Sequence, residues 1–164
     1  MSTVEKSIEV AVPRRTAYDQ WTQFEEFPKF MGGVEQVQQL DDKRLHWKAE
    51  IAGVDREWDA EIVKQEPDER VSWRSTGGAK NDGTVSFTSV GTDKTQVTLR
   101  LDFEPEGFAE TAADVLHVID LQVSKDLDSF KEFIENREVE TGGWRGEVKP
   151  GGEVDNQPNA DTSQ

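Results

Sequence analysis

Apolar residues along this chain recur at two spacings, and the changes between them divide the chain into predicted elements. From Val4 to Val12, apolar and polar side chains alternate. A period of two is typical of a strand with one buried face. After Pro13 the spacing changes to three and four residues, which predicts a short helix from Pro13 to about Phe24. Proline suits the first turn of a helix because its missing N–H group is not needed there.

The stretch WTQFEEFPKFM, residues 21–31, holds four aromatic rings and a methionine. We interpret its first half as core, because Trp21 and Phe24 continue the apolar stripe of the first helix. The second half predicts another short helical turn that ends at the two glycines 32 and 33. Insertion into a membrane surface is disfavoured, since the flanking residues are acidic. The side chains that we expect to form a movable gate are Phe27, Phe30 and Met31.

From Val34 to Phe103 the period of two returns, interrupted by turn signals such as Pro67-Asp68. The segment TGGAKNDG, residues 76–83, is polar and rich in glycine, so we expect a flexible loop there. Strands with one apolar and one polar face, joined by turns, are typical of an antiparallel meander. The side chains predicted to face inward are Leu45, Trp47, Ala49, Ile51, Trp58, Ala60, Ile62, Val71, Trp73, Val85, Phe87, Val97, Leu99, Leu101 and Phe103.

The last apolar pattern predicts one long helix of about 30 residues after Pro105, roughly 45 Å in length. Its apolar positions lie three or four residues apart, at Ala112, Leu116, Ile119, Val123, Leu127, Phe130 and Ile134. We therefore expect a single domain at residues 1–140. Residues 141–164 are rich in Gly, Pro, Asn and Asp, and this composition predicts a disordered tail.

The order of these elements predicts an α+β fold with a curved antiparallel sheet of about six to seven strands. Such a sheet must cover its apolar face, and only the C-terminal helix is long enough to do so. We expect the sheet to wrap around that helix, while the two short helices after the first strand close one end. Because a curved sheet and a straight helix do not fit closely, a cavity is expected between them.

Charge limits the partners that the protein can have. The chain carries 34 acidic and 19 basic residues, a net charge of −15. This charge repels nucleic-acid phosphates and anionic lipid head groups, so we expect no nucleic-acid partner and no stable membrane insertion. The N-terminus lacks the features of a signal peptide, and no apolar run is long enough to span a bilayer. A cytoplasmic protein is expected, as a monomer or a weak homodimer.

The residue types that carry common catalytic chemistry are sparse. The chain has no cysteine, which excludes disulfides and thiolate chemistry. Its two histidines, His46 and His117, lie on different predicted elements, so we expect no metal site and no other cofactor. There is no Gly-x-Ser-x-Gly motif, and TGGAKNDG lacks the Gly-Lys-Ser/Thr ending of a phosphate-binding loop. We assign no catalytic residue.

The N-terminal segment SIEVAVPRRTAYDQWTQFEEFPKFMGGVEQV resembles the start of the polyketide cyclase/dehydrase group in the START-like (SRPBCC, helix-grip) superfamily. The segments AGVDREWDAEIVKQEPDERVSWRS and DLDSFKEFIE extend the resemblance, which covers roughly residues 4–137. The resemblance implies the helix-grip fold and a cavity for a hydrophobic ligand. Members of the superfamily include aromatase/cyclases, coenzyme Q-binding proteins and lipid-transfer domains, so no single reaction is implied.

We interpret the protein as a domain that binds and sequesters a hydrophobic small molecule, which is polyketide-, quinone- or lipid-like. Tryptophans on three strands predict an aromatic wall, although large side chains also fill cores that bind no ligand. Arg56 either orients the ligand or pairs with acidic neighbours. The predicted ligand-binding residues are Trp47, Arg56, Trp58, Trp73, Ser75, Phe87, Leu99, Leu101, Phe103, Leu116 and Ile119.

Two other functions remain open. A polyketide cyclase or aromatase needs groups that polarise carbonyls and move protons, and the candidates are Arg56, Ser75, Tyr18 and His117. A carrier needs only apolar walls and one or two polar anchors, which fits this sequence better. In a ligand-free interaction module, the tryptophan wall would be solid core. A cavity below about 300 Å³ would argue against binding of an ordinary small molecule.

Overall fold

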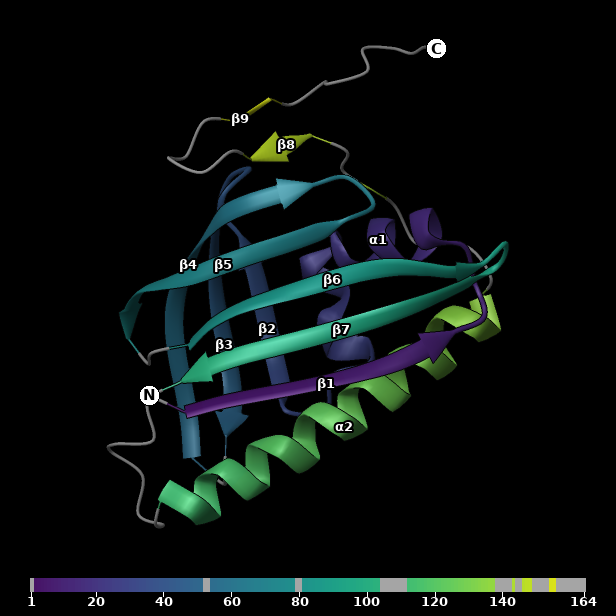
Figure 1. Ribbon diagram of the computed structural model, residues 1–164. Coiled ribbons are helices and arrows are strands. Elements are labelled where there is room, and N and C mark those ends of the chain that lie inside the picture. The colour runs from purple at the N-terminus through teal and green to yellow at the C-terminus, as the bar shows by residue number, and fades with distance from the viewer. Residues whose placement is uncertain are drawn as a thin grey trace.

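The structure is a computed structural model, and it describes residues 2–51, 54–78, 81–103, 112–137, 143, 146–148 and 154–155. Its elements follow the predicted order of a strand, two short helices, six strands and a long helix (Figure 1). They are β1 (Ser2–Val10), α1 (Arg14–Trp21), the 3-10 helix η1 (Phe24–Lys29), β2 (Val34–Gln39), β3 (Arg44–Ile51), β4 (Val54–Glu66), β5 (Arg70–Gly78), β6 (Asn81–Gly91), β7 (Lys94–Phe103), α2 (Ala112–Arg137), β8 (Glu147–Val148) and β9 (Val154–Asp155).

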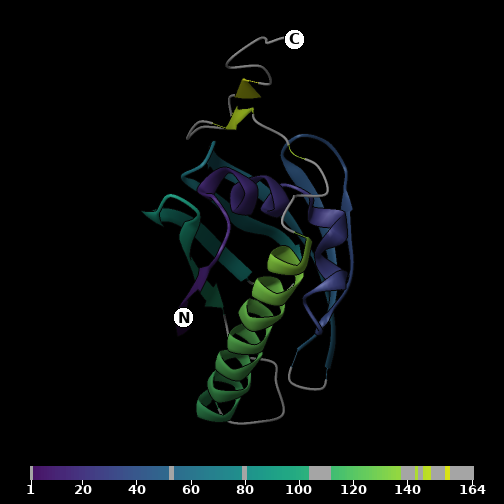
Figure 2. The same cartoon turned by 90° about the vertical axis from the view of Figure 1, so that its right-hand side faces the viewer.

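Seven strands form one antiparallel sheet in the order β1-β7-β6-β5-β4-β3-β2. Strands β2 to β7 follow one another as a meander, whereas β1 pairs with β7 and places Ser2 opposite Phe103. The sheet curls around α2, and α1 lies across one end of the curled sheet (Figure 2). This arrangement confirms the predicted α+β helix-grip fold.

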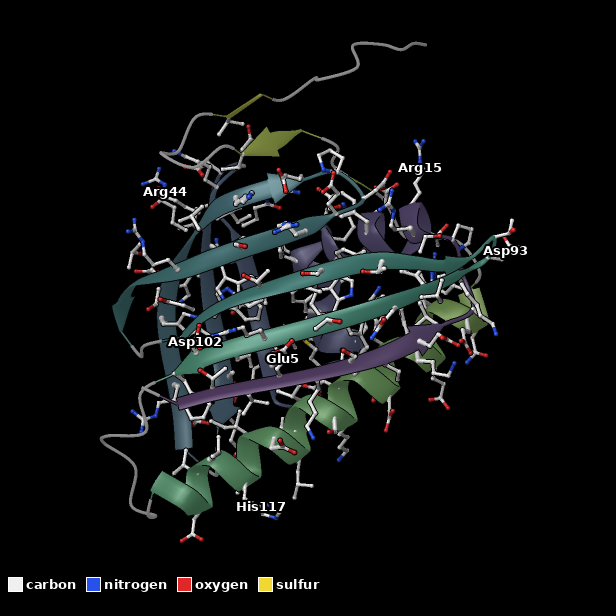
Figure 3. The ribbon with its side chains drawn as sticks, in the orientation of Figure 1. Glu5, Arg15, Arg44, Asp93, Asp102 and His117 are labelled. Carbon is white, nitrogen blue, oxygen red and sulfur yellow. The ribbon has the colours of Figure 1, made fainter. Side chains whose placement is uncertain are left out.

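The core lies between the concave face of the sheet and α2. The strands bury their alternate residues, among them Trp47 and Ala49 on β3 and Trp58 and Ala60 on β4. Along α2 the buried residues recur at helical spacing, at Val115, Ile119, Val123, Leu127, Phe130 and Ile134. Both periods seen in the sequence therefore mark the faces that meet in the core. The outer face of the sheet carries polar and charged side chains such as Glu5 and Asp102 (Figure 3).

The α1 helix begins one residue later than the sequence predicts. Pro13 has an extended conformation and forms the N-cap, so it stands before the first turn of the helix. The helix then buries Ala17, Tyr18 and Trp21 against the end of the sheet. A 3-10 turn follows at η1, where Pro28 lies inside the helix and Phe24 and Phe27 are buried.

The flexible loop predicted for residues 76–83 is wrong for most of that segment. Residues 76–78 extend β5, where Gly78 pairs with Trp58 of β4. Residues 81–83 begin β6, where Asn81 pairs with Phe103 of β7. The polar, glycine-rich composition indicates a loop, but the two long neighbouring strands supply backbone partners that the composition does not reveal. Residues 79 and 80 lie outside the described part.

The sequence predicts disorder for residues 141–164, but the structure describes part of this segment. Strand β8 pairs with β4 at Gln65 and with β9, and the side chain of Val148 is fully buried. Position 143 lies against Asp19 of α1, so closely that an added Cβ atom would come within 2.9 Å of the Asp19 carboxyl carbon. These contacts join residues beyond 140 to the first helix and to the sheet. Apart from residue 146, the rest of the segment lies outside the described part.

On the outer face of the sheet, His46 lies between two carboxylates of the neighbouring strand. Its Nδ1 is 2.7 Å from Asp59 Oδ1, and its Nε2 is 3.0 Å from Glu57 Oε1. Both nitrogens can donate only in the imidazolium form. The hydrogen bonds to Asp59 and then Glu57 therefore raise the pKa of His46 above its ordinary value of 6.5.

We expect NMR titration of His46 to give a midpoint above 6.5, and Asp59→Asn to lower that midpoint by removing the stronger partner. Because the pKa is raised in the folded state, the stabilisation is complete below the unfolded pKa. It is lost as the pH rises through the folded pKa. Asp55→Asn, an exposed change on the same strand, is the control and should leave the midpoint unchanged. A wild-type midpoint at or below 6.5 would contradict this electrostatic assignment.

Candidate functional site

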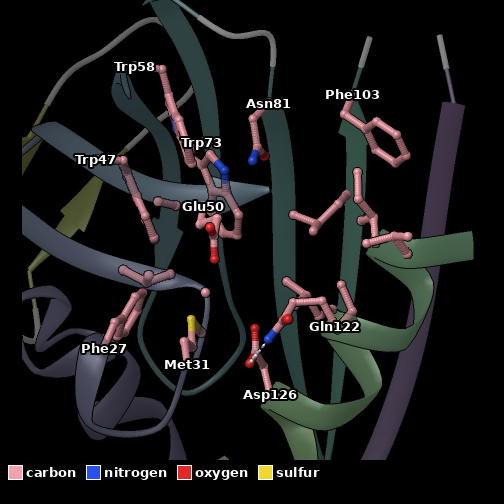
Figure 4. A pocket seen from close by; sticks show the side chains of 18 of the residues that line it. Phe27, Met31, Trp47, Glu50, Trp58, Trp73, Asn81, Phe103, Gln122 and Asp126 are labelled. Carbon is pink, nitrogen blue, oxygen red and sulfur yellow. Dashed lines mark hydrogen bonds between the residues drawn. The ribbon is translucent and has the colours of Figure 1, made fainter. Parts of the chain in front are cut away.

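A cavity of about 150 Å³ lies between the curled sheet and α2 (Figure 4). Its walls come from the sheet strands β3 to β7, from α2, and from the segment between α1 and β2. Seven of the residues that the sequence predicts to bind a ligand line this cavity. They are Trp47, Trp58, Trp73, Leu99, Leu101, Phe103 and Ile119. Val118, which is exposed on α2, lies at the rim.

The tryptophans form one wall because their strands are adjacent and in register. Trp47 and Trp58 are directly opposite on β3 and β4, and their rings stack 5.7 Å apart at an angle of 6°. Trp73 lies on the next strand, β5, across the ladder from Gly83 of β6. A Cβ atom at position 83 would overlap the Trp73 ring, so glycine leaves the space that this indole occupies. The wall offers a broad apolar surface for a flat molecule.

Four predicted ligand-binding residues are not among those that line the cavity: Arg56, Ser75, Phe87 and Leu116. Phe87 is buried toward the α1 end of the sheet, where its ring packs edge-on against Tyr18 at 5.5 Å. Leu116 is half-buried and packs against the core from α2. Arg56, also half-buried, lies opposite Ala49 on the cavity-facing side of β4.

Ser75 helps to connect β5 to β6 through hydrogen bonds. The ladder between β5 and β6 ends at Trp73 and Gly83. Beyond that pair, the Ser75 N–H donates to Asp82 Oδ1 at 2.9 Å, and the Asn81 N–H donates to Ser75 Oγ at 3.2 Å. Side-chain hydrogen bonds therefore continue the connection between the two strands where their backbones separate.

The three side chains predicted as a gate have different surroundings. Phe27 and Phe30 are both almost fully buried, and each contacts several other rings. Phe30 lies 5.2 Å from Phe130 of α2, and Phe27 lies 5.6 Å from Trp47 of β3, measured between ring centroids. Of the three, Phe27 and Met31 line the cavity. Met31 is followed directly by the two glycines that lead into β2.

Polar residues at the cavity were missed by the sequence interpretation, and Asp126 is the foremost of them. Asp126 and Gln122 reach from α2 toward the cavity (Figure 4). Gln122 Nε2 donates to Asp126 Oδ1 at 2.7 Å, and the Gly32 N–H donates to the same oxygen at 3.1 Å. Burial raises the pKa of Asp126 to about 6, although both hydrogen bonds oppose the shift. Glu50 of β3 and Asn81 of β6 also line the cavity.

The other acid–base candidates lie elsewhere. Tyr18 is fully buried in α1, and its hydroxyl accepts a hydrogen bond from Gln65 Nε2 at 3.1 Å. His117 is exposed on α2 and points away from the sheet (Figure 3). Within the described ranges, no group of three or more His, Cys, Asp or Glu side chains is placed to hold a metal ion. The described helices also include none that is long and apolar enough to cross a membrane.

The sheet wrapped around a long helix, with an apolar cavity between them, defines a domain with the helix-grip fold. Residues 10–130 match the family described as polyketide cyclase / dehydrase and lipid transport, and the chain belongs to this family. It is 52% identical, over 149 residues, to an uncharacterized 17.2 kDa protein of Streptomyces lincolnensis from the melC2-rnhH intergenic region. That match covers 90% of this chain and 99% of the relative.

Solved structures show the same fold. A protein of Deinococcus radiodurans aligns with a TM-score of 0.65 at 28% identity, over 83% of this chain and 99% of the other. A START superfamily protein of Mycobacterium smegmatis gives a TM-score of 0.74 at 17% identity, with coverages of 82% and 98%. The Zhui aromatase/cyclase of a Streptomyces species gives 0.64 at 14% identity, with coverages of 84% and 93%. The last two likenesses concern the fold alone.

Proposed function

We propose that this domain binds and sequesters a hydrophobic small molecule, polyketide-, quinone- or lipid-like, in the cavity between the sheet and α2. The observation that carries the proposal is the apolar cavity beneath the three-tryptophan wall of Trp47, Trp58 and Trp73. A bound ring would lie against the indoles, shielded from water by α2. Membership of a family described for polyketide cyclisation and lipid transport supports the same class of ligand.

The volume limits what the cavity holds in this conformation. At about 150 Å³, it lies below the roughly 300 Å³ at which pockets for drug-sized ligands begin. An apolar cavity of this size engineered in another protein binds benzene. We therefore propose that a single ring fits the cavity in this conformation, and that a larger ligand enters only when the segment at Met31 moves away from α2. The Gly32 hydrogen bond to Asp126 would have to break during that opening.

The alternative function, a polyketide cyclase or aromatase, has less support from the site. None of its four candidate groups (Arg56, Ser75, Tyr18 and His117) is among the residues that line the cavity. One observation favours it, namely the pKa of about 6 at Asp126, since a group that titrates near neutral pH suits proton transfer. Turnover of a linear polyketide surrogate that survives Asp126→Asn would contradict this version of the alternative.

Native mass spectrometry of the protein purified from the cells that produce it tests the proposed function. We expect a retained small molecule that dissociates on denaturation. If only the mass of the free protein is found, and NMR titration with toluene leaves the indole N–H signals of Trp47 and Trp58 unchanged, the proposed function is wrong. The tryptophan wall is then solid core, as in a ligand-free interaction module.

We predict that Ala49→Phe abolishes binding while the domain still folds. Ala49 is buried and lines the cavity, so a benzyl group there would occupy the space otherwise open to a ring. The retained ligand should be lost, and the toluene-induced shifts should fall at least tenfold. Ala11→Phe, at an exposed position, is the matched control and should bind as wild type does. Equal binding by both variants would place the ligand elsewhere.

We further propose that the protein acts in the cytoplasm as a monomer or a weak homodimer. The net charge of −15 supports weak association, because like-charged surfaces repel one another. Analytical ultracentrifugation over a range of salt concentrations measures this directly. A stable dimer at low salt would contradict the proposal.

A further inference from the structure

The charged residues that line the cavity are all of one sign. Glu50 and Asp126 line it, and no Lys, Arg or His is among the described residues that do so. The nearest basic neighbour on α2, Lys125, is exposed to solvent. A negative charge brought into this space would meet the half-buried carboxylate of Asp126, whereas Glu50 is exposed to solvent. Arg56, on the cavity-facing side of β4, is not among the lining residues that could compensate for the lost hydration.

Asp126 is also the acceptor best placed to meet a ligand. Both of its hydrogen bonds, from Gly32 and Gln122, end on Oδ1. In the part of the chain that the structure describes, Oδ2 has no such partner, and the side chain forms no ion pair. Hydrogen bonds to ionised acceptors are stronger than those between neutral groups. A ligand that donates to the second oxygen of this partly desolvated carboxylate would therefore gain binding free energy.

Buried polar atoms in the residues that line the cavity also lack hydrogen-bond partners among the described residues. The indole nitrogens of Trp47 and Trp58 and the Oδ1 atom of Asn81 are buried, and none has a hydrogen-bond partner among the described residues. All three residues line the cavity. Buried polar atoms without partners are uncommon in folded proteins. A ligand that carries a polar group on a ring would supply the missing partners without needing any charge.

We propose that Asp126 determines the specificity of the cavity, which accepts an uncharged ring bearing a hydroxyl group and rejects a ring bearing a carboxylate. The hydroxyl group donates to Asp126 Oδ2, and the face of the ring lies against the tryptophan wall. This inference rests on the proposed function, because it names the ligand class of the same cavity. The raised pKa of Asp126 supports it, since that shift reports a carboxylate that water solvates poorly.

Three probes of one shape test the inference: p-cresol, p-xylene and p-toluate. Each is titrated at pH 7.5 into isotope-labelled protein, and the indole N–H signals of Trp47 and Trp58 report binding. We expect p-cresol to bind about tenfold more tightly than p-xylene, because it gains a bond to a charged acceptor. We expect p-toluate to bind at least tenfold more weakly than p-cresol, because the Asp126 carboxylate repels its charge.

Asp126→Asn is the decisive variant. The amide oxygen can still accept from Gly32 and Gln122, while the charge and the second acceptor oxygen are lost. We expect the preference for p-cresol over p-xylene to fall to within about threefold and p-toluate to gain affinity, with p-xylene unchanged. The matched control is Asp128→Asn, an exposed position on the same helix, which should keep all three affinities.

The outcomes separate this inference from the proposed function. If p-xylene binds but p-cresol has no advantage, or if the advantage survives Asp126→Asn, the role of Asp126 is wrong and the proposed function stands. If p-toluate binds wild type as tightly as p-cresol does, the rejection of anions is wrong. If none of the three probes binds and native mass spectrometry finds no retained molecule, the proposed function is wrong, and the proposed specificity is wrong with it. If none binds but a molecule is retained, only the specificity is wrong.

Discussion

Replacing Trp21 by alanine is expected to lower the free energy of unfolding by about 3–5 kcal/mol, the usual cost of truncating a large buried aromatic side chain. Trp21 is only 2% exposed. Its ring lies 5.1 Å from Phe27, 6.1 Å from Phe30 and 5.4 Å from Phe130, so it joins α1, η1 and α2. A loss of this size is a large part of the total stability of a typical domain.

Urea denaturation followed by far-ultraviolet circular dichroism measures the Trp21→Ala effect. Leu121→Ala is the control, because Leu121 is 56% exposed on α2 and surface changes usually stay within about 0.5 kcal/mol. A loss below about 1 kcal/mol for Trp21→Ala would mean that this ring cluster does not hold the three helices together. The aromatic contacts described above would then be incidental to stability.

The second large effect is a gain of stability from Asp126→Asn at neutral pH. Burial raises the pKa of Asp126 from 3.8 to about 6, so the folded state binds this proton more tightly than the unfolded state does. A difference of about two pH units corresponds to roughly 3 kcal/mol at about 1.4 kcal/mol each. Because the side chain is only half-buried, we expect about 1–2 kcal/mol.

The size of this effect depends on pH. Above pH 7 the folded protein holds Asp126 ionised, and the cost of its poor solvation is present in full. As the pH falls through about 6 toward 4, the carboxyl takes up its proton and the cost disappears. The gain from Asp126→Asn should therefore be largest at pH 7–8 and absent near pH 4, in urea denaturation across this range. Asp128→Asn should show no such pH dependence.

A stabilising Asp126→Asn would also fit the specificity proposed for this residue. A carboxylate that costs stability in the free protein regains that free energy when a ligand donates a hydrogen bond to it. If the variant is instead no more stable than wild type at pH 7.5, Asp126 is better solvated than its position indicates. One argument for the role of Asp126 in ligand specificity would then no longer hold.

The fold could be predicted because it depends on local periodicity. Strict alternation in β3 and β4 assigns Trp47 and Trp58 to one face, and the spacing of three and four in α2 assigns Ile119 and Val123 to its buried stripe. The short turns between consecutive strands then determine which residues pair across the sheet. The loop predicted at 76–83 failed because its residues have poor strand propensity, and their pairing comes from β4 and β7 on either side.

The position of the cavity could not be predicted in the same way, because it depends on what fills each end of the sheet. Phe87 and Leu99 both face inward, yet α1 places Tyr18 against Phe87 and leaves the region around Leu99 open. Asp126 follows Val123 by three residues, at the edge of the apolar stripe. Whether such an edge residue reaches the cavity is decided by the way α2 crosses the sheet, which no local pattern specifies.

The pairing of β1 with β7 has a consequence for the order of folding. The β2 to β7 meander is built from neighbours in sequence, so its hairpins can form by closing short loops. The first strand must wait until the chain has been made as far as residue 103, because its partner β7 ends there. Until then its buried residues, Val4 and Val10, are exposed on the ribosome. Closure of this long-range pairing is therefore expected to slow folding.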